Sequence, residues 1–97
     1  NQKTLTEIIT GSYKKLPTII STGNIWSSLD ADKLLKQGAD LVGVGRVAIG
    51  HPNWANNLSN LNYQPKKPPF SVNELEKAKL NKTFISYMKN WNDFVKE

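Results

Sequence analysis

Two apolar segments end in residue types that could bind a phosphate group. Gly23 follows the segment 18–22, and Gly45 ends the segment 41–45, directly before Arg46. Glycine lets the backbone approach an anion and present its N–H groups, and a helix starting after it would add a favourable dipole. Arg46 supplies a fixed positive charge and a fork of donors that suits a phosphate dianion. The pattern therefore predicts a phosphate held between the two segment ends.

These ends meet only if the two segments are neighbouring parallel strands. The segment 18–22 is β-branched and mostly apolar and the segment 41–45 is apolar without alternation, which favours short strands buried on both faces, as in parallel sheets. A helix is predicted between them because Ser27 or Ser28 can cap its start and Gly38 suits a left-handed end. Strand, helix and strand with short connections form a parallel βαβ unit, so Gly23 and Gly45 would share one sheet edge. The predicted buried face of the helix is Ala31, Leu34, Leu35 and Gly38.

A simpler interpretation of the same residues stays open. Gly43 and Gly45 could only permit tight packing, with Arg46 paired to Asp40 or to the chain end. A glycine after a strand is more often a turn residue than a ligand. The pairing of two glycine-ended strands, the second leading into arginine, favours the phosphate interpretation, because many barrels form such a site after strands seven and eight.

The flanking segments predict further helices. Thr4 and Glu7 have capping-box spacing, which predicts a helix that starts at Thr4 and stops before Pro17. After Arg46, a short segment leads to a helical turn near Trp54. Residues 62–69 read as an extended connection because prolines interrupt them. Ser71 or Asn73 then caps a last helical region, broken near Asn81. We divide the chain into βα units over 1–61, a Pro/Lys-rich connection over 62–73 and a helical segment over 74–97.

Length and composition narrow the class of protein. The chain has 97 residues, whereas a complete (β/α)8 barrel needs about 250, so we expect a part of a longer protein. No apolar run approaches the roughly 20 residues that span a bilayer. The net charge is +5, but twelve of the thirteen basic residues are scattered lysines, which argues against nucleic-acid binding. Without cysteine the segment has no thiolate metal site or disulfide, and a cytoplasmic location is expected.

A resemblance to a known family rests on several segments within one region of the chain. The segments are Pro17–Ile25, Asp30–Leu35, Gly38–Arg46, Ile49 and Pro52–Trp54. The region resembles the C-terminal part of NADH:flavin oxidoreductases of the old yellow enzyme family, over about residues 5–58. Its most specific element is the Gly-Ala-Asp strand that leads to Gly-Arg and then to Pro-x-Trp. The resemblance implies an α/β fold, namely the last two βα units of a TIM (β/α)8 barrel followed by a C-terminal helical extension.

The resemblance also implies a cofactor and its ligands. Backbone N–H groups of Gly23, Asn24, Gly45 and Arg46 would hold the phosphate of FMN, with the Arg46 side chain near the phosphate or the flavin edge. NADH or NADPH would reduce the flavin, which would pass hydride to a carbonyl-conjugated alkene. The substrate-activating residues of such enzymes come from earlier strands, so this chain holds no catalytic residue, and no metal site is expected. His51 follows the phosphate segment and is not predicted to be catalytic.

Two further expectations concern neighbours and alternatives. Trp26 and Trp54 could contact the flavin, although a buried tryptophan is more often part of the core. Two strands cannot close a barrel, so the remainder of the barrel, or self-association through open sheet edges, is expected to cover them. The other functions considered are another phosphate-binding barrel enzyme and a non-catalytic assembly module.

Overall fold

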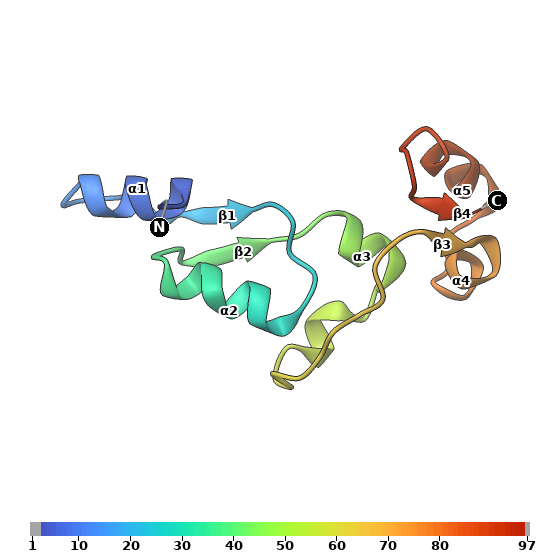
Figure 1. Ribbon diagram of the computed structural model, residues 1–97, viewed down its shortest axis with the longest axis horizontal. Coiled ribbons are helices and arrows are strands. Elements are labelled where there is room, and N and C mark those ends of the chain that lie inside the picture. The colour runs from blue at the N-terminus through green and yellow to red at the C-terminus, as the bar shows by residue number, and fades with distance from the viewer. Residues whose placement is uncertain (1–2, 97) are drawn as a thin grey trace.

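A computed structural model describes residues 3–96 and shows an elongated molecule, 48 × 28 × 26 Å, with α1 at one end and α5 near the other (Figure 1). Its connections between elements are short apart from the segment 58–69, which has no regular structure. The elements are α1 (Leu5–Ser12), β1 (Ile20–Thr22), α2 (Ser28–Lys36), β2 (Leu41–Gly43), α3 (Arg46–Gly50), the 3-10 turn η1 (Trp54–Asn57), β3 (Phe70–Ser71), α4 (Val72–Lys77), α5 (Lys82–Met88) and β4 (Val95–Lys96).

The predicted βαβ unit is present. β1 pairs in parallel with β2, with Ile20 opposite Leu41 and Thr22 opposite Gly43. The helix α2 connects the two strands and lies beside them (Figure 1). We call residues 5–43, which include α1 and this unit, the strand unit. Because the strands are parallel, the segments after Thr22 and after Gly43 leave the sheet at the same edge.

The expectation that both strands are buried on both faces is wrong for residues 3–96. Ile20 is 62% exposed and Leu41 is 53% exposed. The sheet has only two strands, and a parallel sheet is buried only when helices cover both faces and other strands flank it. These side chains therefore lack the cover that their composition predicts.

Local signals set the two ends of α2. The Ser27 hydroxyl accepts a hydrogen bond from the Asp30 N–H, and the Asp30 carboxylate accepts from the Ser27 N–H, which completes a capping box. At the other end Gly38 has φ +115°. The N–H of Ala39 donates to the Leu34 carbonyl and that of Gly38 to the Leu35 carbonyl, the two bonds of a Schellman motif. Of the two predicted N-cap candidates, Ser27 caps the helix, and the predicted left-handed position of Gly38 is confirmed.

The helix α1 begins as predicted, with Thr4 and Glu7 in a capping box. Its contacts with the rest of the strand unit are polar. The Thr6 and Ser21 hydroxyls lie 2.6 Å apart, and the Thr10 hydroxyl donates to the Gln37 carbonyl at 3.1 Å. The apolar side chains of α1 stay exposed, with Leu5 at 73%. Polar contacts rather than apolar burial therefore attach α1 to α2 and β1.

Residues 70–96 form a second unit, which we call the C-terminal unit. Here β3 and β4 pair in parallel, with Phe70 opposite Val95, and α4 and α5 lie between them in sequence. Ser71 caps α4 and Asn81 caps α5, so the predicted break near Asn81 is confirmed. The extended connection ends before Phe70, earlier than the predicted boundary at residue 73, because β3 begins at Phe70 and α4 at Val72.

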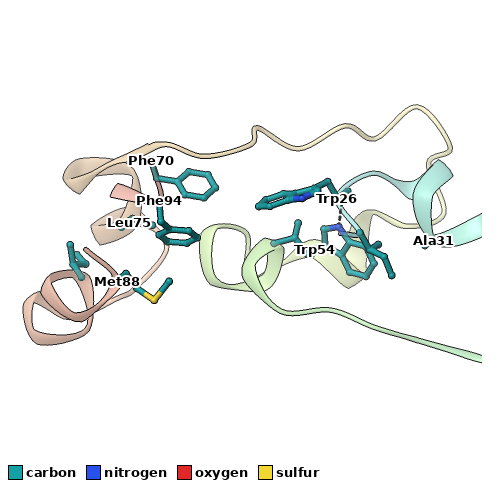
Figure 2. Packing of buried hydrophobic residues seen from close by; sticks show 10 residues of the cluster. Trp26, Ala31, Trp54, Phe70, Leu75, Met88 and Phe94 are labelled. Atoms are coloured by element: carbon teal, nitrogen blue, oxygen red, sulfur yellow. Dashed lines mark hydrogen bonds between the residues drawn. The ribbon is translucent and has the colours of Figure 1, made fainter. Parts of the chain in front are cut away.

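One hydrophobic cluster extends from the start of α2 through α3 and η1 into the C-terminal unit (Figure 2). Trp26, Ala31 and Trp54 lie on one side of this view and Phe70, Leu75, Met88 and Phe94 on the other. Phe70, Leu75, Val47 and Phe94 are the largest side chains that are almost completely buried. The core thus lies beside α3, whereas β1, β2 and α1 contribute no residue to its buried set.

Candidate phosphate-binding site

A cavity of about 310 Å³ lies where the chain leaves β1 and β2. Its volume is at the lower end of the range for ligand pockets, about 300–1,000 Å³. The four residues implied by the resemblance all line this cavity, although they come from segments about twenty residues apart. The complete lining is Thr22, Gly23, Asn24, Ile25, Trp26, Gly43, Val44, Gly45, Arg46 and Val47.

The first wall of the cavity is the turn after β1. Gly23 has φ +137° and Asn24 has φ +54°, so two consecutive residues adopt positive φ. Asparagine is one of the few residues with a side chain that tolerates the left-handed region. A Cβ atom added to Gly23 would meet no atom within 4 Å, so backbone conformation rather than packing favours glycine there. The turn leaves backbone atoms exposed beside the cavity.

The second wall follows β2. A Cβ atom on Gly45 would meet nothing within 4 Å, so the space beside this residue is open to a ligand. Gly43 differs, because a Cβ atom there would collide with the Thr22 hydroxyl of the neighbouring strand. Tight packing therefore explains Gly43 but not Gly45. The helix α3 has only five residues, so it adds little of the helix dipole that the sequence analysis invoked.

Hydrogen-bond donors at the cavity are uncommitted within residues 3–96. The backbone N–H groups of Asn24, Gly45 and Arg46 donate no hydrogen bond to another described residue. The Arg46 side chain is exposed and makes no hydrogen bond or ion pair within the same range. The alternative partner Asp40 is engaged elsewhere, because its carboxylate accepts the Ile19 N–H at 2.8 Å. The residues that line the cavity thus include one fixed cation and three backbone N–H groups without a partner in the described chain.

The two tryptophans near the cavity belong to the core. Trp26 and Trp54 are each 5% exposed, and the Trp54 indole N–H donates to the Trp26 carbonyl at 2.8 Å. Trp26 also lines the cavity, so its position stiffens the wall between the turn after β1 and the start of α2. Trp54 does not line the cavity, and its role is to hold η1 against Trp26.

His51 lies outside the cavity. Its Nε2 atom is 2.8 Å from the Lys66 carbonyl oxygen, and its ring meets the Phe70 ring edge-on at 5.6 Å. These contacts join the end of α3 to the connection 58–69 and to β3.

The ionisable groups with shifted pKa also lie outside the cavity. Burial raises the pKa of Asp30, but hydrogen bonds from the Ser27 and Trp26 N–H groups and the Ser27 hydroxyl outweigh it and hold this pKa below the ordinary value. The Lys66 ammonium and the Ser71 N–H lower the pKa of Glu74 to about 2. Both carboxylates serve helix capping. Among residues 3–96 no group of three or more His, Asp or Glu could hold a metal ion.

Sequence reasoning did not single out Thr22 or Val47 as lining residues. Thr22 directly precedes Gly23, and its place beside Gly43 depends on strand register, which the local pattern does not give. Val47 is 1% exposed and follows Arg46, so the first turn of α3 turns Val47 into the core. The residue types of Gly23, Gly45 and Arg46 suggest phosphate binding, and Asn24 was added from the family resemblance, whereas a lining threonine or valine gives no such signal.

Comparison of the chain with family models, with curated proteins and with solved structures gives no match. Within residues 3–96 no helix has both the length and the apolar character required to cross a membrane.

Proposed function

We propose that this chain supplies the FMN-phosphate site of an NAD(P)H-dependent flavin oxidoreductase that reduces carbonyl-conjugated alkenes. The observation that carries the proposal is the cavity between the two strand ends, which brings Gly23, Asn24, Gly45 and Arg46 together. The phosphate part follows from the chemistry of these residues. The flavin part follows from the sequence resemblance, including the assignment of 5–58 to the last βα units of a TIM barrel.

The residues present fit a phosphate group. The Arg46 guanidinium would pair with phosphate oxygens, and the N–H groups of Asn24, Gly45 and Arg46 would donate to them. The open space at Gly23 and Gly45 lets an anion approach the backbone. A cavity of about 310 Å³ suits the phosphate end of a cofactor, with the remainder extending beyond it.

The chain's own part in such a reaction is positioning. When bound, FMN would accept hydride from NADH or NADPH and transfer it to the alkene. Arg46 and the two turns would fix the phosphate end and so orient the rest of the cofactor. No residue of this chain is assigned to activate the alkene carbonyl or to donate a proton. We therefore expect residues 1–97 alone to show no turnover.

The partner implied by this function is the remainder of a barrel. Ile20 and Leu41 are more than half exposed on the two strands, and both outer edges of the sheet lack a neighbouring strand within residues 3–96. Further parallel strands and helices would cover them. A second copy of this chain is the alternative neighbour, and an assembly module without a cofactor is the alternative function.

A comparison of FMN with riboflavin tests the proposal, because the two differ only in the phosphate group. The full 97-residue chain is titrated with each flavin and binding is followed by flavin fluorescence quenching. We expect FMN to bind more tightly than riboflavin. Arg46→Ala should weaken FMN binding by about 1.5–3 kcal/mol, the range for a charge-assisted hydrogen bond, and leave riboflavin binding unchanged. Lys14→Ala is the matched control, because it removes one positive charge outside the cavity lining.

Three results would contradict parts of the proposal. Equal binding of FMN and riboflavin would exclude phosphate recognition. Equal weakening by Arg46→Ala and Lys14→Ala would show a general charge effect. Full competition by ribose 5-phosphate, with no extra affinity from the flavin ring, would favour another phosphate-binding enzyme.

A further inference from the structure

The helix α3 connects the candidate phosphate cavity to the C-terminal unit. Its first residue, Arg46, lines the cavity, and its last residue, Gly50, lies against the Phe70 ring. Val47, 1% exposed, anchors the middle of this short helix in the core. Only three residues lie between the two ends, so a displacement at Gly50 has little chain in which to be absorbed before it reaches Arg46.

The contact between Gly50 and Phe70 leaves no room for a larger residue. A Cβ atom on Gly50 would lie 2.5 Å from Cζ and 2.8 Å from Cε2 of Phe70. Gly50 has no positive φ, so glycine is required there by the ring and not by the backbone. The absence of a side chain lets α3 approach β3 more closely than any other residue would permit.

Phe70 itself is held on several sides. It is 1% exposed, and its ring meets the Phe94 ring at 5.3 Å and the His51 ring at 5.6 Å, both edge-on. Phe94 is also 1% exposed. Figure 2 shows the Phe70 and Phe94 rings next to one another beside the helices. Because close-packed interiors transmit strain, the ring cannot turn away from an added methyl group without disturbing Phe94 or His51.

We propose that Phe70 is a positioning residue for the phosphate site: its ring fixes the end of α3 at Gly50 and thereby sets where Arg46 lies at the cavity. The C-terminal unit would then determine phosphate affinity although it contributes no residue to the cavity lining. This inference rests on the proposed phosphate function of Arg46. The experiment below distinguishes failure of the positioning role from failure of the proposed phosphate function.

The test uses Gly50→Ala, Phe70→Leu and the double variant in the full chain. Two readouts are taken: the ratio of FMN to riboflavin affinity, and the amide ¹H–¹⁵N signals of Gly45 and Arg46 without ligand. Gly50→Ala should lower the affinity ratio about tenfold, as expected when a charge-assisted bond loses its geometry. The double variant should recover most of this loss, because leucine lacks the far end of the ring. Gly11→Ala is the control, since a Cβ atom there meets nothing within 4 Å.

The outcomes distinguish the positioning role of Phe70 from the proposed phosphate function. Shifted Gly45 and Arg46 signals in Gly50→Ala that return in the double variant support the positioning role, even if the wild-type chain shows no preference for FMN and the proposed function fails. Unchanged signals and an unchanged affinity ratio in Gly50→Ala overturn the positioning role. If Gly50→Ala does not fold, Phe70→Leu alone decides, because loss of the ring contact must then move the Arg46 signal. A merely structural contact would lower stability in the single variants and leave the affinity ratio of the folded protein unchanged.

Discussion

The strand unit and the C-terminal unit each contain a pair of parallel strands, but the two pairs differ in how far their side chains are buried. In both units the strands are joined through helices. In the C-terminal unit, Phe70 on β3 is 1% exposed, whereas Ile20 on β1 is 62% exposed. The difference lies in what surrounds each strand. Phe70 packs against Phe94 and the end of α3, while among residues 3–96 no apolar group from another element buries Ile20.

This contrast indicates where the molecule is complete and where it needs a neighbour. The C-terminal unit buries apolar side chains from β3, α4, α5 and the segment before β4 in the cluster that continues through α3 and η1. The strand unit places its cavity at the strand ends but leaves the strands uncovered. A phosphate site in such a unit would depend on neighbouring elements for rigidity, which agrees with the proposal that further barrel strands cover it.

The largest expected effect on stability is the difference between two leucine substitutions, one in each unit. Leu75 is 0% exposed in the C-terminal unit and Leu41 is 53% exposed in the strand unit. Leu75→Ala should lower the free energy of unfolding by about 2–5 kcal/mol, because it removes buried methyl groups and leaves a cavity. Leu41→Ala should change it by no more than about 0.5 kcal/mol. Urea unfolding followed by circular dichroism measures both.

The same two variants can contradict the claim that the strand unit is exposed. A loss from Leu41→Ala as large as that from Leu75→Ala would mean that Leu41 is buried in solution, by a second copy of the chain. In that case the loss should increase with protein concentration, because association stabilises the folded state by mass action.

Local sequence signals predicted the helix caps, but the sequence did not reveal which strand residues are buried. Ser27 and Ser71 were each one of two cap candidates, and Gly38 was correctly placed, because capping depends on groups within a few residues. Asn81 was predicted as a break in the last helical region and proves to cap α5. The exposure of Ile20 depends on which elements cover it, and no local pattern contains that information. The strands β3 and β4 have two residues each, too few to show any periodicity.

The sequence likewise predicted some residues of the candidate site but not the packing contacts that support it. Gly23, Asn24, Gly45 and Arg46 were assigned because of their residue types, their place after strands and the family resemblance, and the structure brings them to one cavity. The connection from Arg46 through Gly50 to Phe70 was not predicted. It depends on a contact between residues twenty positions apart, which becomes visible only when α3 and β3 are packed together.

A pair of glycines tests how firmly α1 is attached to the strand unit. Gly38 has φ +115°, and a Cβ atom there would lie 2.7 Å from the Thr10 hydroxyl oxygen on α1. Gly38→Ala should lower the free energy of unfolding by about 1–3 kcal/mol, from backbone strain and this collision. Gly11→Ala, with open space around it, should raise it by up to about 1 kcal/mol because alanine favours the helix. Equal effects of the two changes on thermal unfolding would mean that α1 does not pack at Gly38.

Two neighbouring serines separate a capping role from a packing role at the start of α2. The Ser27 hydroxyl caps the helix, whereas Ser28 is 3% exposed and its hydroxyl has no hydrogen-bond partner within residues 3–96. Ser27→Ala should lower the free energy of unfolding by about 1 kcal/mol. Ser28→Ala should be neutral or slightly stabilising, because it removes an unsatisfied buried group. Urea midpoints in the reverse order would contradict the observed hydrogen bonds.

The smallest expected effect is the loss of stability at acid pH when the capping carboxylates of the two units become protonated. Hydrogen bonds from Lys66 and Ser71 lower the pKa of Glu74 to about 2, from 4.5. Since the folded pKa is the lower one, this stabilisation is present above about pH 4.5 and is lost as the pH falls toward 2. The Lys66–Glu74 pair is exposed, at 54% and 41%, so its share is only about 0.2–1 kcal/mol.

Asp30 provides the comparison within the strand unit, because its pKa is also below the ordinary value. A ¹³C titration of the side-chain carboxyl groups should give a midpoint near 2 for Glu74, and Lys66→Ala should raise this midpoint without moving that of Asp30. Glu74→Gln should flatten the dependence of stability on pH in the same acid window. A Glu74 midpoint at its ordinary value in the wild type would mean that neither Lys66 nor the Ser71 N–H is held against the Glu74 carboxylate in solution.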